Sequence, residues 1–201
     1  MAEVDVEVKV HPPGDRDADL WQGLMAGAPE AAQALCARYG PKLLSFAAAR
    51  FPHDRSLAED IMVQSLADAA RHIAWYHPRR STFAVWLYGV ARRQIHNELR
   101  RQRRLKSVPA AAQTPLTNAV ELSDGRDVAD EVAARLQAQR AVAVLSEVLS
   151  DVELEVLVLS SIDELSIREI GLVVGRSERA VHSLLHRART KARERLADDE
   201  R

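Results

Sequence analysis

The stretch GLVVGRSERAVHSLLHRARTKAR, residues 171–193, sets two glycines four positions apart ahead of an apolar rhythm in a strongly basic segment. Just before it, Ser166 and Glu169 have the spacing of a capping box, which satisfies the exposed N–H groups at the start of a helix. Gly175 fits the left-handed position that ends such a helix, and Ser177 can N-cap the next one. The stretch therefore predicts a helix, a tight turn and a second helix.

The second of these helices has two different faces at 3.6 residues per turn. Its apolar face is expected to pack inward and comprises Val181, Leu184, Leu185, Ala188 and Ala192. Its polar face comprises Arg179, His182, Ser183, His186, Thr190 and Arg193. With Gly171 leaving room for a close crossing, the pattern resembles a DNA-binding helix-turn-helix, whose second helix enters the major groove. An ordinary helical hairpin with a solvated basic face would show the same period. We expect DNA contacts from Arg176, Ser177, Arg179, His182, Ser183, His186, Arg187 and Thr190.

A second basic segment follows a cluster of aromatic residues. Five of the nine aromatic residues lie between Trp75 and Tyr88, directly ahead of a basic run from Arg92 to Lys106. Aromatic rings beside cations suit single-stranded nucleic acid, because any base can stack on a ring while the cations follow the backbone. A core reading competes with this one, since Phe83, Trp86, Leu87, Val90 and Ile95 could form the buried face of one helix. Trp75 and Tyr76 are expected to be exposed.

Composition sets the limits on these interpretations. The 201 residues include 28 basic and 29 acidic ones, giving a net charge of −1, but the two basic segments stand on an otherwise acidic background. Helix-forming residues dominate and no alternating β-branched run occurs, so we predict an all-α fold. The sequence has neither an apolar run long enough to span a bilayer nor a signal peptide. No membrane insertion is therefore expected. The single Cys36 excludes an internal disulfide, is expected in the core and suits a cytoplasmic location.

Breaks in helical periodicity predict two small helical domains joined by a flexible linker. Helices are expected from about Leu20 to Lys106, interrupted at Gly40-Pro41, Phe51-Pro52 and His77-Pro78. The predicted organisation is an acidic tail (1–18), a first domain (19–106), a linker (107–130), a second domain with the helix-turn-helix (131–197) and a short tail (198–201).

Catalytic and metal chemistry have little support in the sequence. No glycine-rich phosphate loop follows a strand, and no carboxylate pair stands in an apolar setting. His182 and His186 are four residues apart, as metal ligands can be, but they lack a third ligand. We predict no catalytic residue, no metal site and no cofactor.

Longer motifs resemble a known family. Residues 28–104 and 145–196 are similar to the two conserved regions of the extracytoplasmic-function group of bacterial sigma factors, in the sigma-70 family. The first region matches through ARYGPKLLSFAAARF (37–51), AED (58–60) and YHPRRSTFAVWLYGVARRQIHNELRR (76–101). The second matches through LSDVELEVLVL (149–159), LSIREIG (165–171) and SERAVHSLLHRAR (177–189).

The resemblance implies a promoter-recognition subunit that binds core RNA polymerase and promoter DNA and has no catalytic activity. It assigns the helix-turn-helix to the −35 element and the first domain to an opened −10 element, whose extruded bases would sit in pockets. The −10 candidates are Trp75, Tyr76, Arg80, Arg92, Arg93, His96, Asn97, Arg100 and Arg101. The implied polymerase-binding residues are Glu59, Asp60, Val63 and Gln64. An inhibitory anti-sigma protein is a further implied partner.

Several positions depart from the family pattern. Val63 and Gln64 replace the usual Gln and Glu, and Arg93 replaces a common Asn. Ala180, His182 and Leu184 differ from the common Thr, Lys and Arg of the recognition helix, so no promoter sequence can be carried over. Two other readings stay open. The first is a conventional helix-turn-helix repressor or activator with a helical sensor or dimerisation domain. The second is an interaction protein that titrates polymerase.

Overall fold

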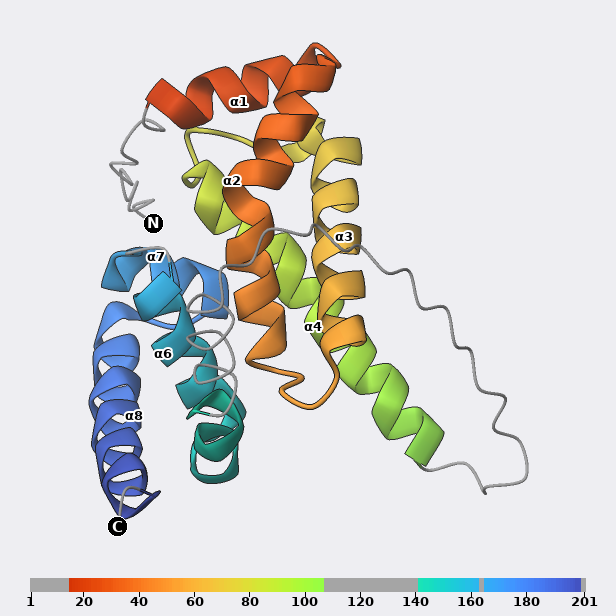
Figure 1. Cartoon of the computed structure of the whole chain (residues 1–201). Coiled ribbons are helices and arrows are strands. Elements are labelled where there is room, and N and C mark those ends of the chain that lie inside the picture. The colour runs from red at the N-terminus through yellow and green to blue at the C-terminus, as the bar shows by residue number, and fades with distance from the viewer. Residues whose placement is uncertain (1–14, 107–140, 163–164, 200–201) are drawn as a thin grey trace, which may run out of the picture.

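The computed structural model describes residues 15–106, 141–162 and 165–199, and the regular structure in these ranges is helical throughout (Figure 1). The all-α prediction is confirmed, with two helical domains. The first domain contains α1 (Asp15–Met25), α2 (Pro29–Ala48), α3 (Arg55–Arg71), the short 3-10 helix η1 (Ile73–Trp75) and α4 (Phe83–Lys106). In the second, residues 141–148 are helical and precede α6 (Asp151–Ile162), α7 (Ile167–Val174) and α8 (Glu178–Asp199).

Aromatic side chains form the centre of the first domain. The rings of Phe46 and Tyr88 meet edge to face at 5.4 Å, and those of Tyr39 and Phe83 lie 5.6 Å apart. All four side chains are almost completely buried. Because Phe83 and Tyr88 both come from the first turns of α4, this half of the helix is fixed in the core. The basic half, about 15 Å long at 1.5 Å per residue, projects beyond the bundle (Figure 1).

Two sequence expectations for α2 were wrong. No break occurs at Gly40-Pro41, because α2 runs through both residues. Packing of Leu35, Tyr39 and Leu43 holds the helix together although Pro41 cannot donate its hydrogen bond. Cys36 lies on the exposed side of the same helix and not in the core. In addition, α1 begins at Asp15, inside the segment expected to be a tail.

The helix-turn-helix forms as the sequence predicts. The Ser166 hydroxyl and the Glu169 carboxylate make both hydrogen bonds of the capping box at the start of α7. Gly175 ends α7 in the left-handed region at φ 67°. The Ala180 N–H donates to the Ser177 hydroxyl at 3.3 Å, which caps α8. A Cβ on Gly171 would lie 2.7 Å from the Arg176 carbonyl oxygen, so the close approach is to the turn as well as to α8.

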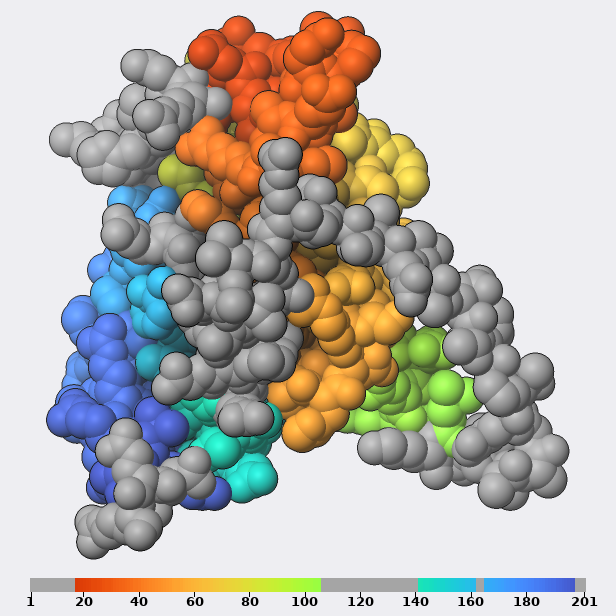
Figure 2. All heavy atoms as spheres, viewed as in Figure 1, coloured from red at the N-terminus to blue at the C-terminus, as the bar shows by residue number. Residues whose placement is uncertain are grey.

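The two domains pack against each other, with α7 on α4 and α6 on α2. Figure 2 shows the blue surface of the second domain meeting the first domain below α1. Two ion pairs between described residues cross the boundary: Arg92 Nε lies 2.6 Å from Glu155 Oε1, and Arg50 Nη1 lies 3.0 Å from Asp151 Oδ1. The Thr82 hydroxyl also donates to Glu169 Oε1 at 3.1 Å. Apolar residues from both domains form one continuous core.

Other predictions concern parts of the chain beyond these helices. The expected linker, 107–130, the first ten residues of the expected second domain and residues 1–14 of the expected tail lie outside the described residues. Among the described helices, none combines the length and the apolar character that crossing a bilayer requires.

Candidate nucleic-acid interface

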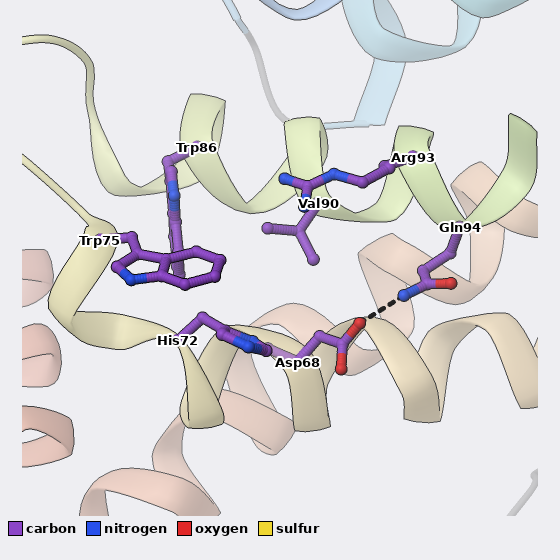
Figure 3. Close-up of a pocket in the computed structure, with 7 residues that line it drawn as sticks. All are labelled: Asp68, His72, Trp75, Trp86, Val90, Arg93 and Gln94. Atoms are coloured by element: carbon purple, nitrogen blue, oxygen red, sulfur yellow. Dashed lines mark hydrogen bonds between the residues drawn. The ribbon is translucent and has the colours of Figure 1, made fainter. Parts of the chain in front are cut away.

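A small pocket opens where α3, η1 and α4 meet (Figure 3). One wall comes from Asp68, His72 and Trp75, which are spaced i, i+4, i+7 along α3 and η1. The other comes from α4 at the same helical spacing and comprises Trp86, Val90, Arg93 and Gln94. Residues at these spacings share one face of a helix. The two stripes were therefore a signal in the sequence, and the roles of Asp68, His72, Trp86 and Gln94 in the pocket were missed.

Two tryptophans supply the flat surfaces of the pocket. Trp75 is 64% exposed, as expected, and its ring lies 4.4 Å from that of His72 with a tilt of 35°. Trp86 is half-buried and its ring packs against those of Tyr76 and Phe83 at 5.6 and 5.7 Å. Both indoles border the same space in Figure 3. Such a surface can stack an unpaired base, which stabilises binding by roughly 1–3 kcal/mol per base.

The polar side of the pocket contains the Asp68 carboxylate, which accepts two hydrogen bonds, and the Arg93 guanidinium. The Gln94 side-chain amide donates to Asp68 Oδ2, and Arg71 donates to Asp68 Oδ1 at 2.6 Å. Arg93 lies over Val90 on the α4 side (Figure 3). Within the described part of the chain, its guanidinium has no hydrogen bond or ion pair. An arginine in this situation has all its donors available for a ligand.

Tyr76 does not lie where the sequence predicted. It is 4% exposed and sits beneath α1, where the ring of Trp21 meets it edge to face at 6.0 Å. Its hydroxyl donates to the Ser81 carbonyl at 3.3 Å, which ties the loop between η1 and α4 to the core. Burial, aided by the Asp17 carboxylate, raises the pKa of Tyr76 to about 12. Tyr76 therefore supports the pocket from behind and does not face a ligand.

The other −10 candidates divide into two groups. Arg80, Asn97, Arg100 and Arg101 are exposed, and Arg101 also pairs with Glu98 on its own helix at 2.7 Å. Arg92 is instead turned toward the second domain and pairs with Glu155. His96 is half-buried, and burial followed by the nearby Arg92, Arg50 and Arg100 lowers its pKa. His96 is consequently a neutral hydrogen-bonding group at pH 7 and adds no positive charge.

The polar face of α8 is open to solvent as the helix-turn-helix predicts. All eight candidates are exposed: Arg176, Ser177, Arg179, His182, Ser183, His186, Arg187 and Thr190. The opposite face is buried, with Val181 and Ala188 fully inaccessible. The hydroxyls of Ser183 and Thr190 donate to carbonyl groups one turn earlier, at 3.0 Å in each case. The exposed face therefore offers mainly arginine, histidine and hydroxyl groups.

A buried carboxylate fixes α8 to α6. Glu153 is 4% exposed and accepts hydrogen bonds from Lys191 at 2.8 Å, from Arg187 at 3.3 Å and from Ser150. Burial alone would raise the pKa of this group, but the hydrogen bonds outweigh it and lower the pKa from 4.5 to about 2. Arg187 is thus partly committed within the domain, a role that sequence reasoning did not identify.

The residues expected to bind polymerase lie along α3. Asp60, Val63 and Gln64 are exposed, and Glu59 pairs with Arg55 at 2.6 Å. Val63 also borders an apolar groove between α2 and α3, together with Leu35, Cys36, Pro41, Leu44, Met62 and Leu66. The groove was missed because the sequence places Cys36 in the core, whereas the continuous α2 turns it toward α3.

Comparisons with known proteins agree with this arrangement. Residues 35–105 match the family model of sigma-70 region 2, and residues 134–191 match that of sigma-70, region 4. The RNA polymerase sigma factor CarQ of Myxococcus xanthus is 29% identical over 172 residues, which are 86% of this chain and 92% of CarQ.

Solved structures of two further proteins have a similar fold. CnrH, in complex with the cytosolic domain of CnrY, has a TM-score of 0.66 at 25% identity, covering 92% of this chain and 99% of that one. The sigma factor RpoE of Bartonella quintana, in complex with the anti-sigma factor NepR, has a TM-score of 0.61 at 19% identity, covering 82% and 96%. In this chain region 2 precedes region 4. Region 2 contains the pocket, and region 4 contains the helix-turn-helix. The chain therefore belongs to the extracytoplasmic-function group of the sigma-70 family and is a sigma factor of RNA polymerase.

Proposed function

We propose that this sigma factor divides promoter recognition between the two surfaces described above. The pocket between α3, η1 and α4 takes an unstacked base of the opened −10 element, and the exposed arginines of α4 follow the strand. The observation that carries this proposal is the exposed Trp75 opposite Trp86, with the partner-free guanidinium of Arg93 beside them. A protein that binds only duplex DNA has no use for a stacking surface of this kind.

The α8 helix reads the −35 element as duplex. Its exposed face carries Arg179, His182 and His186, with Arg176 in the turn before it, and the buried opposite face anchors it to α6 and α7. Arginine contributes most through phosphates and through the acceptors of guanine in the major groove. We expect loss of Arg179 to weaken −35 duplex binding and leave −10 strand binding unchanged.

The same protein binds core polymerase through α3, with Asp60, Val63 and Gln64 as the exposed contacts. It acts in the cytoplasm, where the polymerase works, and it has no catalytic role of its own.

An anti-sigma protein is a further proposed partner, because RpoE, which has the same fold, is bound by the anti-sigma factor NepR. The apolar groove beside Val63 lies next to the polymerase contacts, so an inhibitor bound there would compete with the polymerase.

Run-off transcription tests the proposal. Core RNA polymerase with the full chain should produce promoter-specific transcripts from a template that carries −10 and −35 elements to which this holoenzyme binds. Trp75→Ala should reduce open-complex formation on duplex template and have less effect when the −10 region is already unpaired, because stacking drives the opening. Arg179→Ala should reduce initiation on both templates equally. Tight binding to duplex DNA as a dimer, without any transcript, would instead support a conventional regulator.

A further inference from the structure

Two adjacent arginines on α4 serve different surfaces. Consecutive residues of a helix point about 100° apart, and here Arg92 turns toward the second domain, where Glu155 holds it at 2.6 Å. Arg93 turns toward the pocket, where its side chain lies over Val90, and it lines the same pocket as Trp75 and Trp86 (Figure 3). It has no hydrogen bond or ion pair within the described residues. Of the pair, only Arg93 therefore presents free donors to a bound base.

The groups around Arg93 limit what can bind there. Gln94 donates one of its two amide N–H groups to Asp68, which leaves its second N–H and its side-chain carbonyl oxygen available. Asp68 also accepts from Arg71 and adds no donor. The only donor fork that borders the described pocket without a partner is the guanidinium of Arg93. A base that fits must offer acceptors to this fork and can return a donor to the Gln94 or Asp68 oxygen.

Nucleobases differ in how they meet a two-donor fork. Guanine presents O6 and N7 side by side, and cytosine presents O2 and N3 side by side on the edge that is free in an unpaired strand. Adenine and thymine alternate donors and acceptors along their edges, so neither offers two adjacent acceptors. Only guanine and cytosine can accept both N–H groups of one guanidinium at once.

We propose that Arg93 determines base specificity at the −10 element, selecting guanine or cytosine over adenine or thymine at the one position whose base enters the pocket. This inference rests on the proposed role of the pocket in holding an unstacked base. Stacking on Trp75 and Trp86 is tolerant of sequence, so the choice of base falls to the fork. A well-formed bidentate contact gives a preference of roughly tenfold or more.

The test selects promoters with the intact holoenzyme. Core RNA polymerase carrying the full chain is incubated with a library of duplex fragments randomised across both promoter elements, and the open complexes are sequenced. The wild type should enrich guanine or cytosine roughly tenfold at one −10 position. Single-base substitutions at that position then show which of the two bases the pocket takes.

Three variants separate the fork from the charge. Arg93→Lys keeps the positive charge but replaces the rigid planar fork with a compact ammonium on a flexible stem, so it should retain overall affinity and weaken the preference at that position alone. Arg93→Ala should lose the preference and some affinity. Arg92→Lys is the matched control, because the neighbouring side chain makes the same exchange outside the pocket, and its base preference should equal that of the wild type. Because Arg93 is exposed, neither of the two Arg93 exchanges disturbs the core.

The outcomes distinguish the two proposals. If the holoenzyme selects a −10 sequence but Arg93→Ala keeps the same base preference at every position, Arg93 does not determine specificity. An adenine or thymine preference at the Arg93-dependent position also overturns the inference. If the holoenzyme forms no sequence-selective open complex at all, the proposed function of the pocket fails first.

Discussion

Glu153 joins three tasks in one buried side chain. It caps the start of α6 through Ser150, and it holds Lys191 and Arg187 of α8. Because these hydrogen bonds favour the ionised form, its pKa falls to about 2 in the folded chain. The carboxylate therefore stabilises the position of the recognition helix relative to α6 at neutral pH.

Replacing Glu153 should destabilise the second domain in a pH-dependent manner. A depressed pKa contributes stability that is present above the ordinary pKa of 4.5 and is lost as the pH falls toward about 2. We expect Glu153→Gln to cost at most about 3 kcal/mol at pH 7, the equivalent of this shift, and progressively less between pH 4.5 and 2. Thermal unfolding followed by circular dichroism at several pH values measures the difference.

A surface carboxylate provides the control for this measurement. Glu147 is largely exposed and pairs with Arg195 at 3.5 Å, so Glu147→Gln should change stability by less than about 1 kcal/mol at any of these pH values. Equal losses for both variants, or a Glu153→Gln effect that persists at pH 2, would contradict the assigned role of Glu153.

Single residues also show the limits of sequence reasoning. The neighbours Trp75 and Tyr76 have the same local context in sequence, yet one is 64% and the other 4% exposed. The difference depends on α1, whose Trp21 covers Tyr76 from a position 55 residues earlier in the chain. Burial of this kind is a tertiary contact, and no local pattern of residues encodes it.

At the scale of elements, the turn between α7 and α8 packs so closely on Gly171 of α7 that this position has no room for a side chain. A Cβ on Gly171 would come within 2.7 Å of the Arg176 carbonyl oxygen, so Gly171→Ala must displace the turn. We expect reduced thermal stability and weaker −35 duplex binding, with −10 strand binding retained. Fluorescence anisotropy with labelled duplex and single-stranded DNA distinguishes the two activities.

The matched exchange is Gly89→Ala, in the interior of α4. Nothing lies within 4 Å of a Cβ at this position, so alanine should stabilise the helix by about 0.5–1 kcal/mol. Opposite signs for the two Gly→Ala exchanges are expected. A loss of stability at both positions would show that the contact with Arg176 is not what makes Gly171 necessary.

Elements with strong local signals were predicted well. The capping box, the left-handed Gly175 and the apolar face of α8 are all encoded within a few residues, so the sequence was enough to place them. The Gly40-Pro41 break was wrong because packing along α2 outweighs the local cost of proline. The pocket required two helices to meet, and only its exposed members, Trp75 and Arg93, were found in advance.

At the scale of the whole molecule, the packed arrangement cannot occupy both promoter elements together. The −10 and −35 elements lie 25 base pairs apart by name, which is roughly 85 Å at 3.4 Å per base pair. Two bodies of fewer than 100 residues in contact have centres roughly 35 Å apart, given radii of gyration of about 13 Å. Residues 107–140 could span roughly 110 Å when fully extended, so the chain is long enough to let the domains separate.

We expect this separation to be measurable by fluorescence energy transfer. Dyes on Ala26→Cys and Ala197→Cys, in a Cys36→Ala background, report on the two domains from exposed positions. Transfer should be higher in the free chain than in the open complex with polymerase and promoter. Glu155→Gln weakens the contact with Arg92 and should lower transfer in the free chain. Unchanged transfer in transcribing complexes would contradict the separation.

The Glu169 carboxylate divides its two oxygens between the domains. Oε2 accepts from the Ser166 backbone and hydroxyl, while Oε1 accepts from Thr82 of the first domain. When the domains part, only Oε1 exchanges its partner for water, and the start of α7 keeps both of its own bonds. The helix-turn-helix therefore undocks as a finished unit. It then binds DNA with α7 already folded, so the binding free energy includes no entropic cost of ordering α7.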